Sequence, residues 1–131
     1  MFFIVWIVYF VFAFILGVSP TLTATTRKSR LNKEESLHLA RSEEEGFKVH
    51  GYFAPKSNHI ELYLFNCSFK KSIETIIHET RHAWQFKNGF MKFDSEGCVL
   101  NVEECEEEAS VYADKWVLRF RLNGKEGQDE P

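Results

Sequence analysis

Residues 70–87 constrain the fold more than any other segment, because their apolar side chains recur with the period of an α-helix. One side of this predicted helix collects Ile73, Ile76, Ile77, Thr80 and Trp84. Ser72 predicts the N-cap, and Asn88 followed by Gly89 predicts the end. The opposite side carries the polar sequence HETRH at positions 78–82. The segment therefore predicts an amphipathic helix with one side in a core and the other available for chemistry.

The two histidines of this helix, His78 and His82, have the spacing of a metal site. Side chains four residues apart project from one face of a helix, one turn above the other. Both imidazoles can therefore bind one zinc ion, which histidine nitrogens coordinate at about 2.0–2.1 Å. Glu79 is turned by roughly 100° around the helix, where its carboxylate can accept a proton from water without being a ligand. The pattern H-E-x-x-H in a helix is typical of zinc metallopeptidases.

A catalytic zinc ion needs a third protein ligand, and the second long helix predicted over residues 102–122 can supply it. Its apolar stripe consists of Val102, Cys105, Ala109, Tyr112, Ala113, Trp116 and Phe120. Glu106 lies at one edge of this stripe, and Glu108 flanks the other side. We predict Glu106 as the third ligand, with Glu108 as the alternative. The other glutamates of the acidic run 103–108 are predicted to face solvent.

Two segments upstream of this helix have the composition of β-strands. Residues 47–53 and 59–65 are separated by Ala-Pro-Lys-Ser-Asn, which predicts a hairpin. In the second strand Ile60, Leu62 and Leu64 alternate with other residues, so one aliphatic face should pack on a helix. Residues 60–65 form either an exposed edge strand that binds an extended peptide or an ordinary sheet strand. Residues 31–45 predict a weakly amphipathic helix that ends near Gly46.

This order of hairpin, H-E-x-x-H helix and acidic helix resembles the small ImmA/IrrE-type metallopeptidases. Their pattern continues with E-x-x-A-[ND]-x-[FY]-A, which residues 106–113 match except for Ser110, and Arg81 replaces a common small residue. The resemblance covers residues 47–120. It implies an α+β, zincin-like fold in which a short antiparallel sheet packs on the H-E-x-x-H helix and a second long helix. It also implies that His78, His82 and Glu106 bind zinc and that Glu79 is the general base.

Residues 2–18 read FFIVWIVYFVFAFILGV, without a charged side chain. This length is close to the minimum for crossing a bilayer, and apolar residues all round disfavour a core helix. No basic residue precedes the run and Leu22 fits a cleavage site poorly, so we predict a retained transmembrane helix rather than a cleaved signal. Arg27, Lys28 and Arg30 follow it, which predicts a membrane-anchored domain on the cytoplasmic side. A secreted or extracytoplasmic domain is the alternative.

The 131 residues leave about 100 for folding behind this segment, enough for one core. We predict a membrane anchor at 1–19, a polar and basic linker at 20–30, a metallopeptidase-like domain at 31–123 and a disordered tail at 124–131. The net charge of −3 and the scattered basic residues argue against a nucleic-acid partner. Cys67, Cys98 and Cys105 lack C-x-x-C spacing and are predicted to be reduced structural thiols.

The sequence thus predicts a zinc metallopeptidase that hydrolyses a peptide or protein substrate at the membrane. A non-catalytic protein-binding module of the same fold is the alternative, and a zinc ion that only joins two helices is a third interpretation. Glu79 favours the enzyme, because a purely structural site does not need it. Candidates for stabilising the oxyanion are His59, Tyr63, Arg81 and Tyr112. Gln85, two turns from His78, is predicted to be a surface amide rather than part of the cleft.

Overall fold

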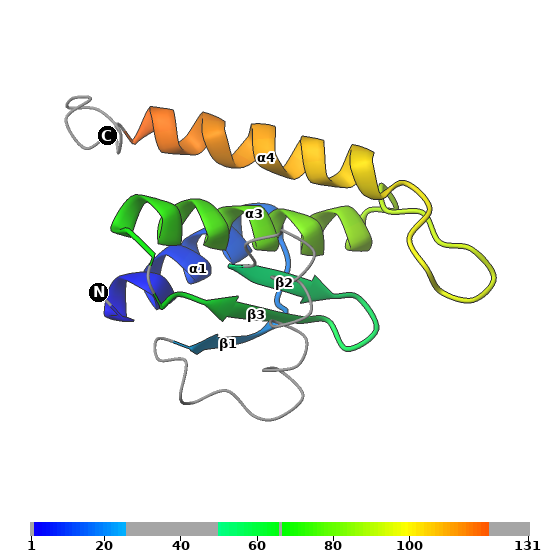
Figure 1. Cartoon of the computed structure of the whole chain (residues 1–131), viewed down its shortest axis with the longest axis horizontal. Helices are drawn as coiled ribbons and strands as arrows, with labels where there is room; N and C mark the ends of the chain where they lie inside the picture. The colour runs from blue at the N-terminus through cyan, green and yellow to red at the C-terminus, as the bar shows by residue number, and fades with distance from the viewer. Residues whose placement is uncertain (1, 26–49, 66, 121–131) are drawn as a thin grey trace.

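The computed structural model describes residues 2–25, 50–65 and 67–120. Its elements are α1 (Phe2–Leu16), β1 (Thr21–Thr25), β2 (Gly51–Ala54), β3 (His59–Tyr63), α3 (Phe69–Lys87) and α4 (Val102–Arg119). Helix α3 is central: α4 packs along one side of it, and α1 and the sheet lie on the other (Figure 1). The described residues therefore confirm an α+β architecture with a small sheet.

The sheet has three strands in the order β1-β3-β2. β2 and β3 form the predicted hairpin, with Phe53 opposite Ile60, and β1 pairs with β3 in parallel, with Leu22 opposite Ile60. The sheet is therefore mixed, and the prediction of a purely antiparallel one is wrong. β3 lies in the middle, so residues 60–65 are not an exposed edge strand. Within the described residues β2 is the edge strand next to α3.

β1 corrects the prediction of a polar linker over residues 20–30. Threonine is β-branched and fits a strand well, and the side chains of Leu22 and Thr25 are buried. A polar composition therefore did not exclude a strand, because β3 supplies its hydrogen-bond partners. The rest of the predicted linker beyond Thr25, the predicted helix over residues 31–45 and the predicted tail over residues 124–131 lie outside the described residues.

Helix α1 overturns the prediction of a transmembrane helix. It is 15 residues long. Among residues 2–25, 50–65 and 67–120, no helix has both the length and the apolar character that crossing a membrane requires. The predicted membrane anchor, and with it the membrane-anchored location, are therefore wrong. Val5, Tyr9, Phe12 and Ala13 recur at helical spacing and are buried, so the helix packs one face on the protein and leaves residues such as Phe14 exposed.

Two apolar clusters join the layers. The larger one lies between α1, the sheet and α3 and contains Val5, Tyr9, Ala13, Leu22, Ile60, Leu62, Leu64 and Ile76. It confirms that the aliphatic face of β3 packs on helices. The smaller one joins α1, α3 and α4 through Phe12, Ile73, Ile77 and Ala113. Because each such side chain stabilises by about 1.5–3 kcal/mol when fully buried, α3 is held firmly from both sides.

The ends of α3 and of α1 are tied by hydrogen bonds. Ser68, not the predicted Ser72, is the N-cap of α3, and its hydroxyl accepts from the Lys71 backbone N–H at 3.1 Å. The helix ends at the predicted Asn88 and Gly89. Lys87 Nζ donates to the Gly17 carbonyl at 2.5 Å, which links the end of α3 to the end of α1. The polar face of α3 is thereby held in a defined orientation.

Candidate metal centre

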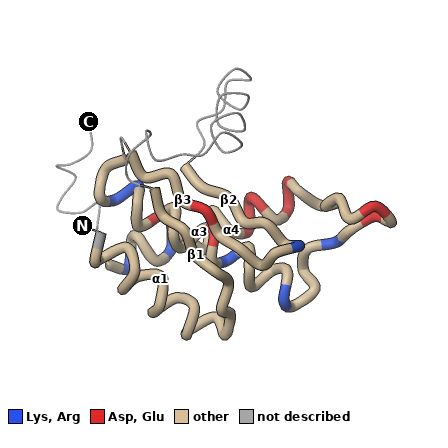
Figure 2. The backbone as a smooth tube through the Cα atoms, turned by 90° about the horizontal axis from the view of Figure 1, so that it is seen from below, with Lys and Arg blue, Asp and Glu red and all other residues tan. Residues whose placement is uncertain are grey.

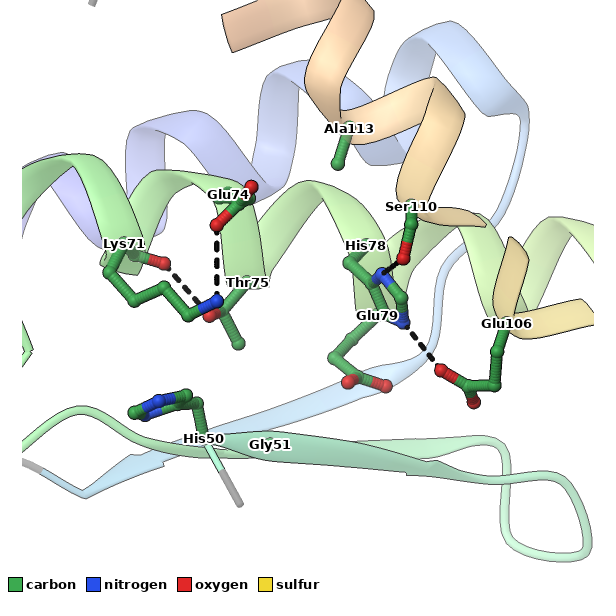
Figure 3. A pocket seen from close by; sticks show the side chains of 10 residues that line it. All are labelled: His50, Gly51, Lys71, Glu74, Thr75, His78, Glu79, Glu106, Ser110 and Ala113. Carbon is green, nitrogen blue, oxygen red and sulfur yellow. Dashed lines mark hydrogen bonds and ion pairs between the residues drawn. The ribbon is translucent and has the colours of Figure 1, made fainter. Parts of the chain in front are cut away.

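The imidazoles of His78 and His82 lie side by side on the polar face of α3, with ring centroids 4.7 Å apart and planes at 88°. Glu79 is between them in the sequence and turns toward the sheet (Figure 3). One ligand atom from each of these three residues lies within 4.8 Å of the other two. His78, Glu79 and His82 therefore form a group that could hold a metal ion.

Helix α4 brings a second carboxylate to the same point. Glu106 Oε1 lies 3.0 Å from His78 Nε2, and Glu106 Oε2 lies 3.1 Å from His82 Nε2 (Figure 3). Cys105 and Ala109 are buried against α3, which places Glu106 at the edge of the helix contact. Ligand atoms about 2.1 Å from one ion at tetrahedral angles lie about 3.4 Å apart, so the spacing of these donor atoms is close to that of ligands around a single metal ion.

The pKa values in this cluster record how strongly its members interact. Hydrogen bonds from His78 and His82 hold the pKa of Glu106 far below its usual range, against the effect of burial. Burial lowers the pKa of His82, but the hydrogen bond to Glu106, the charge of Glu79 and the hydrogen bond to Gln85 outweigh it and raise the pKa to about 9. The site thus concentrates negative charge where both imidazole Nε2 atoms point.

Glu79 is buried beneath the imidazoles. Its Oε1 atom is inaccessible and has no hydrogen-bond partner in the described part of the chain. Burial raises the pKa of Glu79, and Glu106 adds to this rise, while His82 and His78 oppose it. A buried carboxylate oxygen without a partner is costly, so its position calls for a ligand or a chemical role.

Glu108, the alternative third ligand, lies in a different environment. Arg81 holds it through Nη2 at 2.6 Å and through Nε at 3.0 and 3.1 Å to its two oxygens. On the outer side of His78, Ser110 Oγ is 3.4 Å from Nδ1. Ser110, at the position where the ImmA/IrrE-type pattern has Asn or Asp, therefore faces His78.

Two cavities meet at the carboxylates. The first has a volume of about 300 Å³ and is mainly polar; its lining includes His50, Lys71, Glu74, Thr75, His78 and Ser110. The second has a volume of about 220 Å³ and is more apolar; its lining includes Phe53, Met91, Val99, Val102 and Cys105. Gly51, Glu79 and Glu106 line both. Together these two cavities make up the groove beside β2, and both carboxylates lie in the wall that the cavities share.

Several residues singled out from the sequence lie elsewhere. His59, Tyr63, Arg81 and Tyr112 are absent from the lining of these two cavities. His50, which the sequence analysis missed, lines the larger cavity opposite Lys71 (Figure 3), and its Nδ1 lies 3.1 Å from Cys67 Sγ. Its position inside the strand predicted over residues 47–53 carried no signal of this role.

The sequence analysis also made predictions for Gln85 and for the three cysteines. Gln85 is fully buried, so its prediction as a surface amide is wrong. Within the described residues, Cys67, Cys98 and Cys105 form no disulfide bond with one another. Charge is unevenly spread: Figure 2 shows acidic residues gathered at the start of α4 and at the tip of the loop that precedes it, with lysines and arginines scattered.

No family model, curated protein or solved structure matches this chain. The resemblance to the ImmA/IrrE-type metallopeptidases therefore stays a prediction. The geometry of His78, Glu79, His82 and Glu106 is the feature of the described residues that bears on function.

Proposed function

We propose that this chain is a zinc-dependent peptidase of the kind its resemblance to the ImmA/IrrE-type enzymes implies. His78, His82 and Glu106 are the zinc ligands, and Glu79 is the general base. One observation carries the proposal: a buried Glu79 oxygen, without a hydrogen-bond partner among the described residues, lies beside two imidazoles that converge on a second carboxylate. A zinc ion that only joined α3 and α4 would need the ligands and would not need Glu79.

The donor set favours zinc over magnesium and calcium. Two imidazole nitrogens and one carboxylate suit zinc, whereas magnesium and calcium prefer oxygen ligands. Three protein ligands leave one coordination position open, as in catalytic zinc sites. Glu79 and Glu106 both line the two cavities beside β2, so a substrate in these cavities would lie next to the proposed ligands and base.

Glu106, rather than Glu79, is the third ligand in this proposal. Its oxygens lie within hydrogen-bond distance of both Nε2 atoms, whereas Glu79 Oε1 has no hydrogen-bond partner in residues 2–25, 50–65 and 67–120. A carboxylate kept out of the ligand set can act as a base. The two acidic residues therefore have separate roles that follow from their different contacts.

In the proposed reaction, the chain's own residues bind and orient the substrate and move protons. Bound at this position, zinc supplies Lewis-acid polarisation of a peptide carbonyl and makes water more acidic. Glu79 accepts the proton of the attacking water and delivers it to the departing amine, so the proton balance closes. The low exposure of Glu79 keeps bulk water from competing for its oxygens.

The proposed substrate is a peptide or protein segment that lies in the groove beside β2. The groove continues on both sides of Glu79 and Glu106, which suits a chain that extends past the reacting bond in both directions. The apolar cavity accepts an apolar side chain on one side of that bond. Met91, Phe53 and Cys105 line this cavity.

The decisive experiment compares Glu79→Gln and His78→Ala with the wild-type full chain. We expect zinc content near one ion per chain in the wild type and in Glu79→Gln, and a large loss in His78→Ala. Cleavage of a mixed peptide library should be slower by about 100-fold or more in Glu79→Gln than in the wild type, and it should be lost in His78→Ala. Glu107→Gln, an exposed residue of α4, is the matched control and should equal the wild type.

Two results would contradict the proposal in different ways. Equal zinc in wild type and His78→Ala would show that these histidines do not bind the ion. If the wild type binds zinc but cleaves no peptide, the metal site is supported and the proposed peptidase function is contradicted.

A further inference from the structure

Gln85 is a fully buried amide that contacts His82, and the proposed mechanism does not use it. We propose that Gln85 is a positioning residue: it dictates which nitrogen of His82 faces the metal position, and the Arg81–Glu108 ion pair holds Gln85 in that orientation. This inference rests on the proposed metal site. It adds a second layer of residues whose contacts, not their own coordination, govern metal binding.

The orientation of the Gln85 amide follows from its partners. Nε2 lies 2.9 Å from the Cys105 carbonyl oxygen and 2.7 Å from Glu108 Oε1. Both partners only accept hydrogen bonds, so the NH₂ group of Gln85 must face them. Oε1 must then face His82, whose Nδ1 is 2.8 Å away.

The tautomer of His82 follows in turn. The carbonyl oxygen of Gln85 can only accept, so His82 Nδ1 carries the hydrogen and donates it. A histidine binds a metal ion as the neutral imidazole, and a hydrogen kept on Nδ1 then leaves the electron pair of Nε2 for the ion. Nε2 is the atom that faces Glu106 and the metal position. Gln85 thus prepares His82 to bind through the correct atom.

Arg81 and Glu108 keep this arrangement rigid. The Arg81 guanidinium is stacked between Trp84 and Tyr112, with its carbon 3.8 and 4.2 Å from the two ring centroids. It holds Glu108 through several hydrogen bonds, so Glu108 presents Oε1 to Gln85 in one position. These contacts connect Arg81 on α3 to Glu108 on α4, and Glu108 in turn to Gln85 on α3.

A purely structural role for Gln85 makes a different prediction, because its bonds to Cys105 and Glu108 also join the two helices. Gln85→Met removes both the helix contact and the acceptor for His82. Gln85→Glu combined with Glu108→Gln exchanges the two side chains, restores an acceptor for Nδ1–H and keeps the net charge. It loses the bond to the Cys105 carbonyl. If Gln85 positions His82, a variant needs only an acceptor for the Nδ1 hydrogen of His82. If Gln85 mainly joins the helices, a variant also needs the bonds to the Cys105 carbonyl and to residue 108.

The test measures zinc affinity by competition with a chromophoric chelator, and the His82 tautomer by long-range ¹H–¹⁵N spectra of the zinc-loaded full chain. Wild type should show a hydrogen on Nδ1 of His82. In Gln85→Met this hydrogen should lose its hydrogen-bond partner and exchange faster with water, so its signal should disappear, and zinc should bind about 10–100-fold more weakly with the His78 signals unchanged. The exchanged double variant should recover the Nδ1 hydrogen and most of the affinity.

The outcomes separate this inference from the proposed function. The inference is overturned if Gln85→Met binds zinc as wild type does, or if the double variant is as weak as Gln85→Met. A wild-type chain that binds no zinc overturns the proposed function and this inference together. Thermal unfolding of each metal-free protein, and Glu107→Gln as a control, show whether a variant is folded. If Gln85→Met does not fold, Glu108→Gln alone, which loosens Gln85, should weaken zinc binding to a smaller extent.

Discussion

Three neighbouring glutamates on α4 differ in what surrounds their carboxylates. Glu106 faces both imidazoles of α3, and Glu107 is exposed. Burial raises the pKa of Glu108, but hydrogen bonds from Arg81 and Gln85 outweigh this effect and lower the pKa overall. Glu108 is thus kept charged by Arg81 rather than by an ion. Of these three carboxylates, that of Glu106 is the one placed to share a metal with the histidines.

Replacing each of these glutamates by glutamine should produce three different results. Glu106→Gln removes a charged ligand, so zinc affinity should fall by about 100-fold or more. Glu108→Gln disturbs only the support of His82, and the loss should stay near or below about 10-fold. Glu107→Gln should bind as wild type. Chelator competition at fixed pH measures all three, and equal losses for Glu106→Gln and Glu108→Gln would contradict the assignment of Glu106.

Helical periodicity was sufficient to predict that Glu106 and the histidines meet, because both helices are regular and one period places each side chain. It was not sufficient for Gln85. Its buried amide depends on Glu108 and on the carbonyl of Cys105, which only the packing of α4 on α3 brings near. His50 was missed for the same reason: its place in the groove depends on how β2 approaches α3.

At the scale of elements, the groove depends on how closely β2 approaches β3 and α3. Gly51 is the point of contact, because a Cβ atom there would lie 2.9 Å from the Glu61 carbonyl oxygen and 3.2 Å from Thr75 Cγ2. The first of these is a backbone atom, so relief would require movement of the strand. Gly51 also lines both cavities. The absence of a side chain therefore lets the edge strand run close to Glu79.

Gly51→Ala should lower the free energy of unfolding by about 1–3 kcal/mol, the usual range for added volume in a tightly packed place. Urea unfolding followed by circular dichroism measures this loss. Ser57→Ala, on the exposed connection between β2 and β3, should stay within about 0.5 kcal/mol of wild type. A Gly51→Ala protein as stable as wild type would show that the strand moves freely and that the groove is not rigid.

The elements were predicted unevenly, for a physical reason. The hairpin, α3 and α4 have local patterns of period 2 or 3.6, and these patterns persist in the folded chain. β1 has a polar sequence, and its strand pairing comes from β3, which lies far along the chain, so no local pattern indicated it. In α1 the apolar residues lie all round the helix, so no polar face indicated which side would pack on the protein.

For the whole molecule, α1 is the element on which both apolar clusters depend. Val5, Tyr9 and Ala13 belong to the cluster with the sheet, and Phe12 belongs to the cluster with α3 and α4. Phe12 meets the Trp116 ring edge to face at 5.3 Å between centroids. The Tyr9 hydroxyl donates to the Pro20 carbonyl and fixes the turn into β1. Helix α1, which the sequence predicted to span a membrane, therefore holds α3, the helix that carries His78 and His82, in place.

Two phenylalanines of α1 give a matched test of this role. Phe12 is 1% exposed and Phe14 is 87% exposed, although both belong to the same turn of one helix. Phe12→Ala should cost about 3–5 kcal/mol of unfolding free energy, because it opens a cavity between the three helices. Phe14→Ala should change stability by no more than about 0.5 kcal/mol. Denaturant unfolding of the full chain measures both, and equal effects would show that α1 is not part of the core. Because α1 packs on the back of α3, Phe12→Ala should also weaken zinc binding, whereas Phe14→Ala should leave it unchanged.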